Sequence, residues 1–242
     1  MSSLYLREDL VSTSVGERLS IVGAEAKHAA TVNRTRPGET VTIGNGRGLM
    51  ATGSVIAATP SELTIEVGSV SRLERPTPLL SLAQALAKGD RDELAVQAST
   101  ELGIDEVLPW AAERSVSRWD GPKVAKGRER WSAIAREAAK QSIRSWVPEV
   151  GELVTSKQLP ALAKTVRMLV LEPTAEVPLT SVRPDGRDIV VVVGPEGGLS
   201  QAELTRFADA GAELVRLGDT VLRTSTAGPA SIAVLNAVLG RW

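Results

Sequence analysis

Hydrophobic and polar residues follow different patterns on the two sides of residue 75. Before it, short runs with alternating or β-branched apolar positions are separated by Gly, Asn, Pro and Ser, which is typical of closely spaced strands. We expect strands at residues 3–7, 18–22, 39–43 and 62–67, and one short helix at 24–32. Short strands with little helix between them favour a small β-barrel or sandwich.

After residue 75 the pattern changes to strands that alternate with helices. Arg75-Pro-Thr-Pro78 reads as a stiff, extended connector, so we place a boundary between a domain of residues 1–75 and a domain of residues 76–242. The expected strands span residues 79–87, 105–109, 166–171, 189–193 and 213–217, and the expected helices span 91–102, 127–146, 200–211 and 226–239. This alternation predicts an α/β layer architecture with a mainly parallel sheet.

Composition excludes several kinds of chemistry. The 242 residues include no Cys and one His, so a disulfide framework, a Cys zinc site, a thiol nucleophile and a multi-His metal site are excluded. The longest clean apolar run, residues 189–193, is too short to span a bilayer, and Met1-Ser-Ser-Leu-Tyr5 lacks the layout of a secretion signal. We therefore expect a cytoplasmic protein with no membrane segment and no metal.

Charge is balanced over the whole chain but not within it. With 28 Lys and Arg against 29 Asp and Glu, the net charge of −1 argues against a globally basic nucleic-acid binder. Residues 113–146, however, hold nine basic and four acidic side chains. This stretch fits either a solvated helix face or a contact surface for RNA, and Trp110, Trp119 and Trp146 flank it either as packing residues or as stacking surfaces for bases.

Three predicted strands end in loops of unusual composition, and ligands of open α/β sheets bind beyond the carboxyl ends of strands. Val193-Gly-Pro-Glu-Gly-Gly198 allows a ligand to approach the backbone closely, yet it matches neither a Walker loop nor a GxGxxG fingerprint. Residues 217–226 place Arg223 beside the start of a helix, and residues 169–173 end at Glu172-Pro173. Each loop alone is also explained by a tight turn or by helix capping.

Several motifs occur in a specific order along the chain. They are Leu82-Ala-Gln-Ala-Leu-Ala-Lys-Gly-Asp-Arg91, Thr100-Glu-Leu-Gly-Ile104, Pro109, Glu113-Arg-Ser115, Arg130-Trp131, Glu137-Ala-Ala-Lys-Gln-Ser142, Gly194-Pro-Glu-Gly-Gly-Leu-Ser200, Leu217-Gly218 and Val221-Leu-Arg-Thr224. With this set the chain resembles the ribosomal RNA small subunit methyltransferase E family, 16S rRNA uridine-N3 methyltransferases of the SPOUT superfamily. The resemblance covers nearly the whole chain.

The resemblance implies a fold, a cofactor and partners. It implies a SPOUT-type α/β methyltransferase domain with a C-terminal trefoil knot, preceded by a small PUA-like β-barrel domain that binds RNA. It implies S-adenosylmethionine as cofactor, 16S rRNA or the small ribosomal subunit as substrate, and a homodimer. The implied cofactor-binding residues are Leu171, Glu172, Pro173, Val193, Gly194, Pro195, Glu196, Gly197, Gly198, Leu217, Gly218, Val221, Leu222 and Thr224.

Methylation of uridine N3 requires loss of the N3 proton while negative charge develops on the base oxygens. Arg223 is the candidate for stabilising that charge, and the proton acceptor is Glu196, a hydroxyl or solvent. Family members often carry Thr-Glu-Thr where this chain has Thr224-Ser-Thr226, so a carboxylate base is missing at Ser225. Candidate RNA-binding residues are Arg7, Arg34, Arg36, Lys88, Arg91, Arg114 and Arg144.

Two other functions compete with this prediction. The same cofactor motifs fit a SPOUT methyltransferase that acts on another RNA or another base atom. The missing carboxylate at Ser225 is also compatible with an RNA-binding ribosome assembly factor that has lost methyl transfer.

Overall fold

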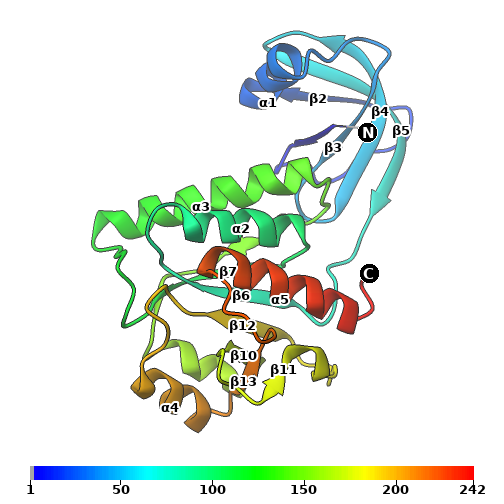
Figure 1. Ribbon diagram of the computed structural model, residues 1–242. Helices are drawn as coiled ribbons and strands as arrows, with labels where there is room; N and C mark the ends of the chain where they lie inside the picture. The colour runs from blue at the N-terminus through cyan, green and yellow to red at the C-terminus, as the bar shows by residue number, and fades with distance from the viewer. Residues whose placement is uncertain (1–2) are drawn as a thin grey trace. The chain divides into compact units, whose positions relative to one another are not determined.

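The computed structural model describes residues 3–242, and its chain divides into two units (Figure 1). The first unit contains the chain up to Arg75 together with Ala139–Val147, and the second contains Pro76–Ala138 together with Pro148–Trp242. Met1 and Ser2, which belong to the stretch expected to lack a secretion signal, lie outside the described residues. The first unit thus includes a short segment that is distant in sequence from the rest of it.

The first unit is built on a five-stranded sheet in the order β1-β3-β4-β5-β2. β1 pairs with β3 in parallel and the other neighbours are antiparallel. One face carries a core that includes Tyr5, Ile43 and Leu63, all fully buried. The strands are β1 (Leu4–Leu6), β2 (Arg18–Val22), β3 (Thr40–Gly44), β4 (Leu49–Ala58) and β5 (Glu62–Arg72), and α1 (Gly23–Lys27) continues into a π-helix, η1 (His28–Val32).

Strand β4 lies where the sequence predicted no strand. Its residues are mostly small, and Gly53 sits where the register with β5 shifts, at a position where a Cβ would overlap the Glu66 carbonyl. A glycine inside a strand often marks such a bulge, and it also weakens the strand signal in the sequence. The alternation of buried Leu49, Ala51 and Val55 is the remaining signal of this strand.

The second unit contains an eight-stranded parallel sheet with helices on both faces. The strand order is β11-β13-β10-β12-β6-β7-β8, and β9 also pairs with β7. Figure 1 shows α2, α3 and α5 on one side of the sheet and α4 on the other. The strands are β6 (Leu80–Ala85), β7 (Glu106–Ala111), β8 (Glu149–Val150), β9 (Val154–Thr155), β10 (Arg167–Leu171), β11 (Val177–Pro178), β12 (Ile189–Val193) and β13 (Glu213–Arg216). The helices are α2 (Arg91–Glu101), α3 (Pro122–Gln141), η2 (Leu159–Lys164), η3 (Leu179–Ser181), α4 (Gln201–Asp209) and α5 (Thr224–Val238).

Strand β12 explains why this sheet needs two helical layers. Ile189, Val191 and Val193 belong to the core on one face, whereas Val190 and Val192 belong to the core on the other. Because successive side chains of a strand point to opposite faces, a continuous apolar run is buried only when both faces are covered. The expected α/β architecture with a parallel sheet is confirmed.

Helix α3 differs from its prediction at both ends. It begins at Pro122 and ends at Gln141, after which Ile143 adopts a φ of +55°. Near this end Lys140, expected on a polar face, is buried within the first unit, with its Nζ 3.0 Å from Glu25 Oε1. A buried ammonium requires such a partner, because desolvation of an isolated charge is costly.

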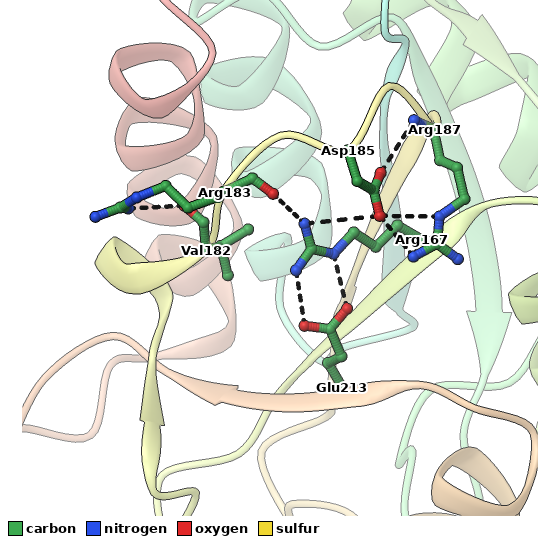
Figure 2. A network of polar contacts seen from close by, with 6 residues as sticks. All are labelled: Arg167, Val182, Arg183, Asp185, Arg187 and Glu213. Atoms are coloured by element: carbon green, nitrogen blue, oxygen red, sulfur yellow. Dashed lines mark hydrogen bonds and ion pairs between the residues drawn. The ribbon is translucent and has the colours of Figure 1, made fainter.

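Charged side chains tie together the amino ends of two central strands (Figure 2). Arg167, at the start of β10, donates to both carboxylate oxygens of Glu213, at the start of β13, over 2.7 and 2.9 Å, and also to the Arg183 carbonyl. The hydrogen bonds with Glu213 raise the pKa of Arg167. The opposite, carboxyl ends of these strands are left for the loops described next. Among the described helices, none has the length and hydropathy needed to cross a bilayer.

Candidate functional site

A cavity of about 450 Å³ lies at the carboxyl ends of β10, β12 and β13. It is formed by the three loops whose composition stood out in the sequence, with additional contributions from α2 and α5. Its lining residues are Arg91, Leu171, Glu172, Pro173, Val193, Gly194, Pro195, Glu196, Gly198, Leu199, Val215, Arg216, Leu217, Gly218, Thr220, Val221, Leu222, Arg223, Thr224 and Ala227. All predicted cofactor-binding residues except Gly197 line this cavity.

Glycines at two positions allow the backbone to form the cavity wall. Gly198 has a φ of +67° and Gly218 a φ of +138°, both in the range that strongly favours glycine. At Gly197 the restriction is one of space, since a Cβ would come within 3.2 Å of Arg114 Cβ. Gly197 therefore faces Arg114 and contributes to the shape of the loop.

Thr224 connects three elements at the cavity. Its hydroxyl donates to the Gly194 carbonyl over 3.0 Å and accepts from Gln84 Nε2 over 2.9 Å. Gln84 lies near the end of β6, Gly194 follows β12 and Thr224 begins α5. Thr224 and Gln84 are buried, so these bonds hold the loop and the helix start in a fixed geometry.

Arg223 precedes α5 and lines the cavity as an exposed side chain. Within residues 3–242 it has no ion-pair partner. A guanidinium stays protonated under all ordinary conditions, so Arg223 places a full positive charge at the cavity wall. The N–H groups of the first turn of α5 point the same way in charge, because the amino end of a helix carries partial positive charge.

Glu196 fastens the glycine-rich loop to the start of α2. Its Oε1 accepts from Arg91 Nη1 over 2.9 Å and from the Lys88 N–H over 3.1 Å. Partial burial works to raise the pKa of Glu196, but the hydrogen bonds from its own and the Lys88 backbone N–H and from Arg91 outweigh it and lower that pKa. Glu196 is therefore a carboxylate at neutral pH and a weak proton acceptor.

Arg114 holds the other side of the same loop. Its Nη1 donates to the carbonyls of Gly197 and Leu199, each over 3.1 Å. Sequence reasoning assigned Arg114 only to RNA, whereas the structure gives its guanidinium two acceptors in the loop. The signal for this role is the pairing of an Arg with a loop rich in glycine carbonyls, which no pattern within either motif reveals.

Glu203 is a fully buried carboxylate that the sequence predicted only as part of a capping box. The capping box is present, with the Ser200 N–H donating to Glu203 Oε2 over 2.8 Å. In addition, Oε1 accepts from the Glu113 N–H over 2.8 Å and from Ser156 Oγ over 2.6 Å. Glu203 thus joins the loop after β7, the loop after β9 and the start of α4.

The other predicted RNA-binding residues are spread over both units. In the second unit, Lys88 is exposed and Arg91 lines the cavity. In the first unit, Arg7 is held by Asp9 at 3.2 Å, and Arg34 and Arg36 are exposed. Arg144 is half-buried and belongs to the segment Ala139–Val147 of that unit.

The cavity suits the cofactor that the resemblance implies. Leu171, Leu217 and Leu222 offer apolar contacts for an adenine ring, while loop N–H and C=O groups and the first turn of α5 offer polar partners. The volume falls in the range of small-molecule sites, roughly 300–1,000 Å³. Among the described residues there is no cluster of His, Asp and Glu that could hold a metal ion.

Comparison with known proteins gives the same family for both parts of the chain. The RNA methyltransferase domain family matches residues 74–236, and the RNA methyltransferase PUA domain family matches residues 21–68. The chain is 39% identical to the ribosomal RNA small subunit methyltransferase E of Mycobacterium bovis, over 91% of this chain and 86% of the relative. It is 33% identical to the enzyme of the same name from Bacillus subtilis, over 86% and 85% of the two chains.

Solved structures show the same relationship. The ribosomal RNA small subunit methyltransferase E of Neisseria gonorrhoeae, bound to S-adenosyl methionine, is 27% identical and superposes with a TM-score of 0.87 over 98% of both chains. A structure from Legionella pneumophila in complex with the cofactor SAM is 30% identical, with a TM-score of 0.83 over 98% of this chain and 96% of that one. On the evidence of sequence and fold together, this chain belongs to the ribosomal RNA small subunit methyltransferase E family.

Proposed function

We propose that this protein transfers a methyl group from S-adenosylmethionine to N3 of a uridine in the 16S rRNA of the small ribosomal subunit. The observation that carries the proposal is the cavity at the strand ends, where glycine-rich loops meet the unpaired guanidinium of Arg223. The relatives named for small-subunit rRNA methylation, and the neighbours bound to the cofactor, support the substrate and the cofactor.

The residues that would hold the cofactor are those of the three loops. Leu171, Leu217 and Leu222 would cover the faces of its adenine, and the loops 193–198 and 217–224 would bind its polar groups. When bound, the cofactor supplies a methyl group on a positively charged sulfur, ready for displacement. The protein's contribution is then to position the uracil and to stabilise the charge that develops on it.

Arg223 is the proposed source of that stabilisation. Loss of the N3 proton leaves negative charge shared with the neighbouring oxygens of the uracil ring. A guanidinium that has no competing carboxylate partner can place its N–H groups against such an oxygen. The proton acceptor is then solvent or a hydroxyl group, because the lowered pKa of Glu196 makes this carboxylate a poor base.

Replacing Glu196 by Gln separates a loop-holding role from a base. The amide can still accept from the Lys88 N–H, but it loses the charge that attracts Arg91. We expect the Kd for the cofactor, measured by titration calorimetry, to rise about three- to tenfold, in line with roughly 1 kcal/mol for one charge-assisted contact. Saturating cofactor should restore kcat, whereas loss of a general base would leave kcat low at every concentration.

The pH dependence gives an independent reading of Glu196. A carboxyl whose pKa is lowered by folding stabilises the folded loop above its unfolded pKa, and this contribution is lost as the pH falls through the lower, folded value. Both values lie at or below the ordinary 4.5. Between pH 6 and 9 the wild type and Glu196→Gln should therefore have pH–kcat profiles of the same shape, and a difference in shape would restore Glu196 as the base.

RNA binding is proposed for both units. Arg7, Arg34, Arg36 and Arg144 would contact phosphates from the first unit, which matches a PUA family, and Lys88, Arg91 and Arg114 from the second. We further propose that the protein acts as a homodimer in the cytoplasm, where ribosomal subunits are assembled.

The test is transfer of a tritiated methyl group into small subunits from cells that lack the gene, followed by mapping of the modified nucleotide. Label at N3 of one uridine of 16S rRNA is expected. Label at another atom or in another RNA would support a different methyltransferase specificity. Tight cofactor binding without any label would instead support an RNA-binding assembly factor.

A further inference from the structure

A second cavity, of about 400 Å³, lies within the second unit. It is bounded by the loop before α2 and the first turn of that helix, by the chain before α3, and by the first half of α3. Its lining residues are Ala87, Gly89, Asp90, Asp92, Glu93, Ser117, Arg118, Trp119, Lys123, Lys126, Gly127, Arg130 and Trp131. None of these residues has a role in the site described above.

The second cavity has an excess of unpaired positive charge. Among the acidic residues of its wall, Glu93 is held by Arg130 through contacts of 2.5 and 2.6 Å. Asp92 is buried, accepts from the Ala87 and Glu93 N–H groups, and has a pKa raised by that burial. Among residues 3–242, Arg118, Lys123 and Lys126 have no ion-pair partner. Three cations thus face one remaining acidic side chain, Asp90.

An aromatic ring is fixed in the wall beside these cations. Trp119 packs edge-on against the buried Trp131, with ring centroids 5.1 Å apart and planes at 73°. It also lies against α3 at Gly127, where a Cβ would overlap the indole ring. Glycine inside a helix weakens the helix, so its presence here is explained by the space that Trp119 needs. The result is a rigid, half-exposed tryptophan next to Lys123 and Lys126.

One loop forms part of both cavities. Arg91 lines the first cavity and bonds to Glu196, whereas Gly89 and Asp90 line the second. Gly89 and Asp90 have φ values of +66° and +59°, and the left-handed conformation is uncommon for a residue other than glycine. A polymer that enters the first cavity therefore has the second directly across a two-residue turn.

We propose that the second cavity binds a nucleotide of the substrate RNA that flanks the methylated one. Arg118, Lys123 and Lys126 would contact its phosphates and Trp119 would stack on its base. Phosphate contacts and aromatic stacking together are the usual means of holding single-stranded RNA. The inference rests on the proposed function, since it assigns the ligand of the second cavity from the polymer that reaches the first.

The charge arm of the test compares two double variants of equal charge change. Lys123→Ala/Lys126→Ala removes two cations of the cavity, whereas Lys157→Ala/Lys164→Ala removes two exposed lysines elsewhere in the second unit. We expect the first pair to weaken binding of unmodified 16S rRNA about tenfold and to reduce the salt dependence, with log Kd changing by roughly 0.7 less per lost phosphate contact. The control pair should leave both unchanged, and the cofactor Kd should be unchanged in both.

The stacking arm uses Trp119. Trp119→Ala should raise the KM for RNA about tenfold, within the range found for loss of one base stack, and Trp119→Phe should restore most of it. Cross-linking of 16S rRNA that contains 4-thiouridine, followed by tryptic mapping, should label the peptide Trp119–Lys123. This readout needs no turnover.

The outcomes separate this inference from the proposed function. Bound RNA that leaves Trp119–Lys123 unlabelled, or a cavity pair that behaves like its control, would overturn the second site while methyl transfer stands. A labelled peptide with no methyl transfer into rRNA would overturn the proposed function and leave the second site as an RNA contact.

Discussion

Replacement of Arg223 by Ala is expected to lower kcat for rRNA methylation about 100- to 1,000-fold, the cost typical of losing one donor that stabilises developing negative charge. The side chain is exposed at the cavity wall and has no ion-pair partner among the described residues, so its charge is available to the substrate. Single-turnover transfer at saturating cofactor and RNA measures this effect directly.

Two controls give the Arg223 result its meaning. Titration of the variant with cofactor should give a Kd within about twofold of the wild type, because the loops that bind it do not depend on this guanidinium. Arg187→Ala removes a guanidinium at the opposite end of the sheet, where it is paired with Asp185 at 2.6 Å, and should leave kcat unchanged (Figure 2). A wild-type rate for Arg223→Ala would remove Arg223 from the chemistry.

Replacement of Glu203 by Ala is expected to lower the free energy of unfolding by about 3 kcal/mol, because it leaves buried donors without an acceptor. The Glu113 and Ser200 N–H groups and the Ser156 hydroxyl all donate to this carboxylate, and none of these bonds can be replaced by water in a fully buried position. Urea unfolding should show a lower midpoint with an unchanged slope.

Asp209→Ala is the matched control for Glu203. It removes an exposed carboxylate from the same helix, α4, and should change the unfolding free energy by less than about 0.5 kcal/mol, as is usual for surface sites. Glu203→Gln keeps an acceptor but turns an amide N–H₂ towards other donors, so its cost should lie between the two. Equal midpoints for Glu203→Ala and Asp209→Ala would contradict the structural role of the buried carboxylate.

Sequence predicts best those parts of this fold in which local pattern and tertiary environment agree. The bounds of β2 and β12 match their predictions, since alternation in one and a continuous apolar run in the other report directly on burial. The cavity was also foreseeable, because loops after parallel strands meet at one edge of a sheet. The knot and the homodimer stay predictions that follow from the family resemblance.

Sequence failed where a residue's role depends on a partner that is distant in the chain. Lys140 is buried because of Glu25, which lies more than 100 residues away, and Arg114 is bound to carbonyls about 85 residues further on. Nothing near either residue signals its partner. β4 was missed for a local reason, since small residues and Gly53 give a weak strand pattern.

The bonds of Thr224 have a consequence for how the site is made in the cell. The hydroxyl joins Gln84 to Gly194, and Arg223 and the start of α5 complete the same wall. A ribosome that is translating this chain has therefore released most of the sheet before the residues that close the cavity emerge. Until residues 217–227 have docked, a nascent chain has strands and a core but no complete binding site, so the protein becomes active only at the last stage of its own synthesis.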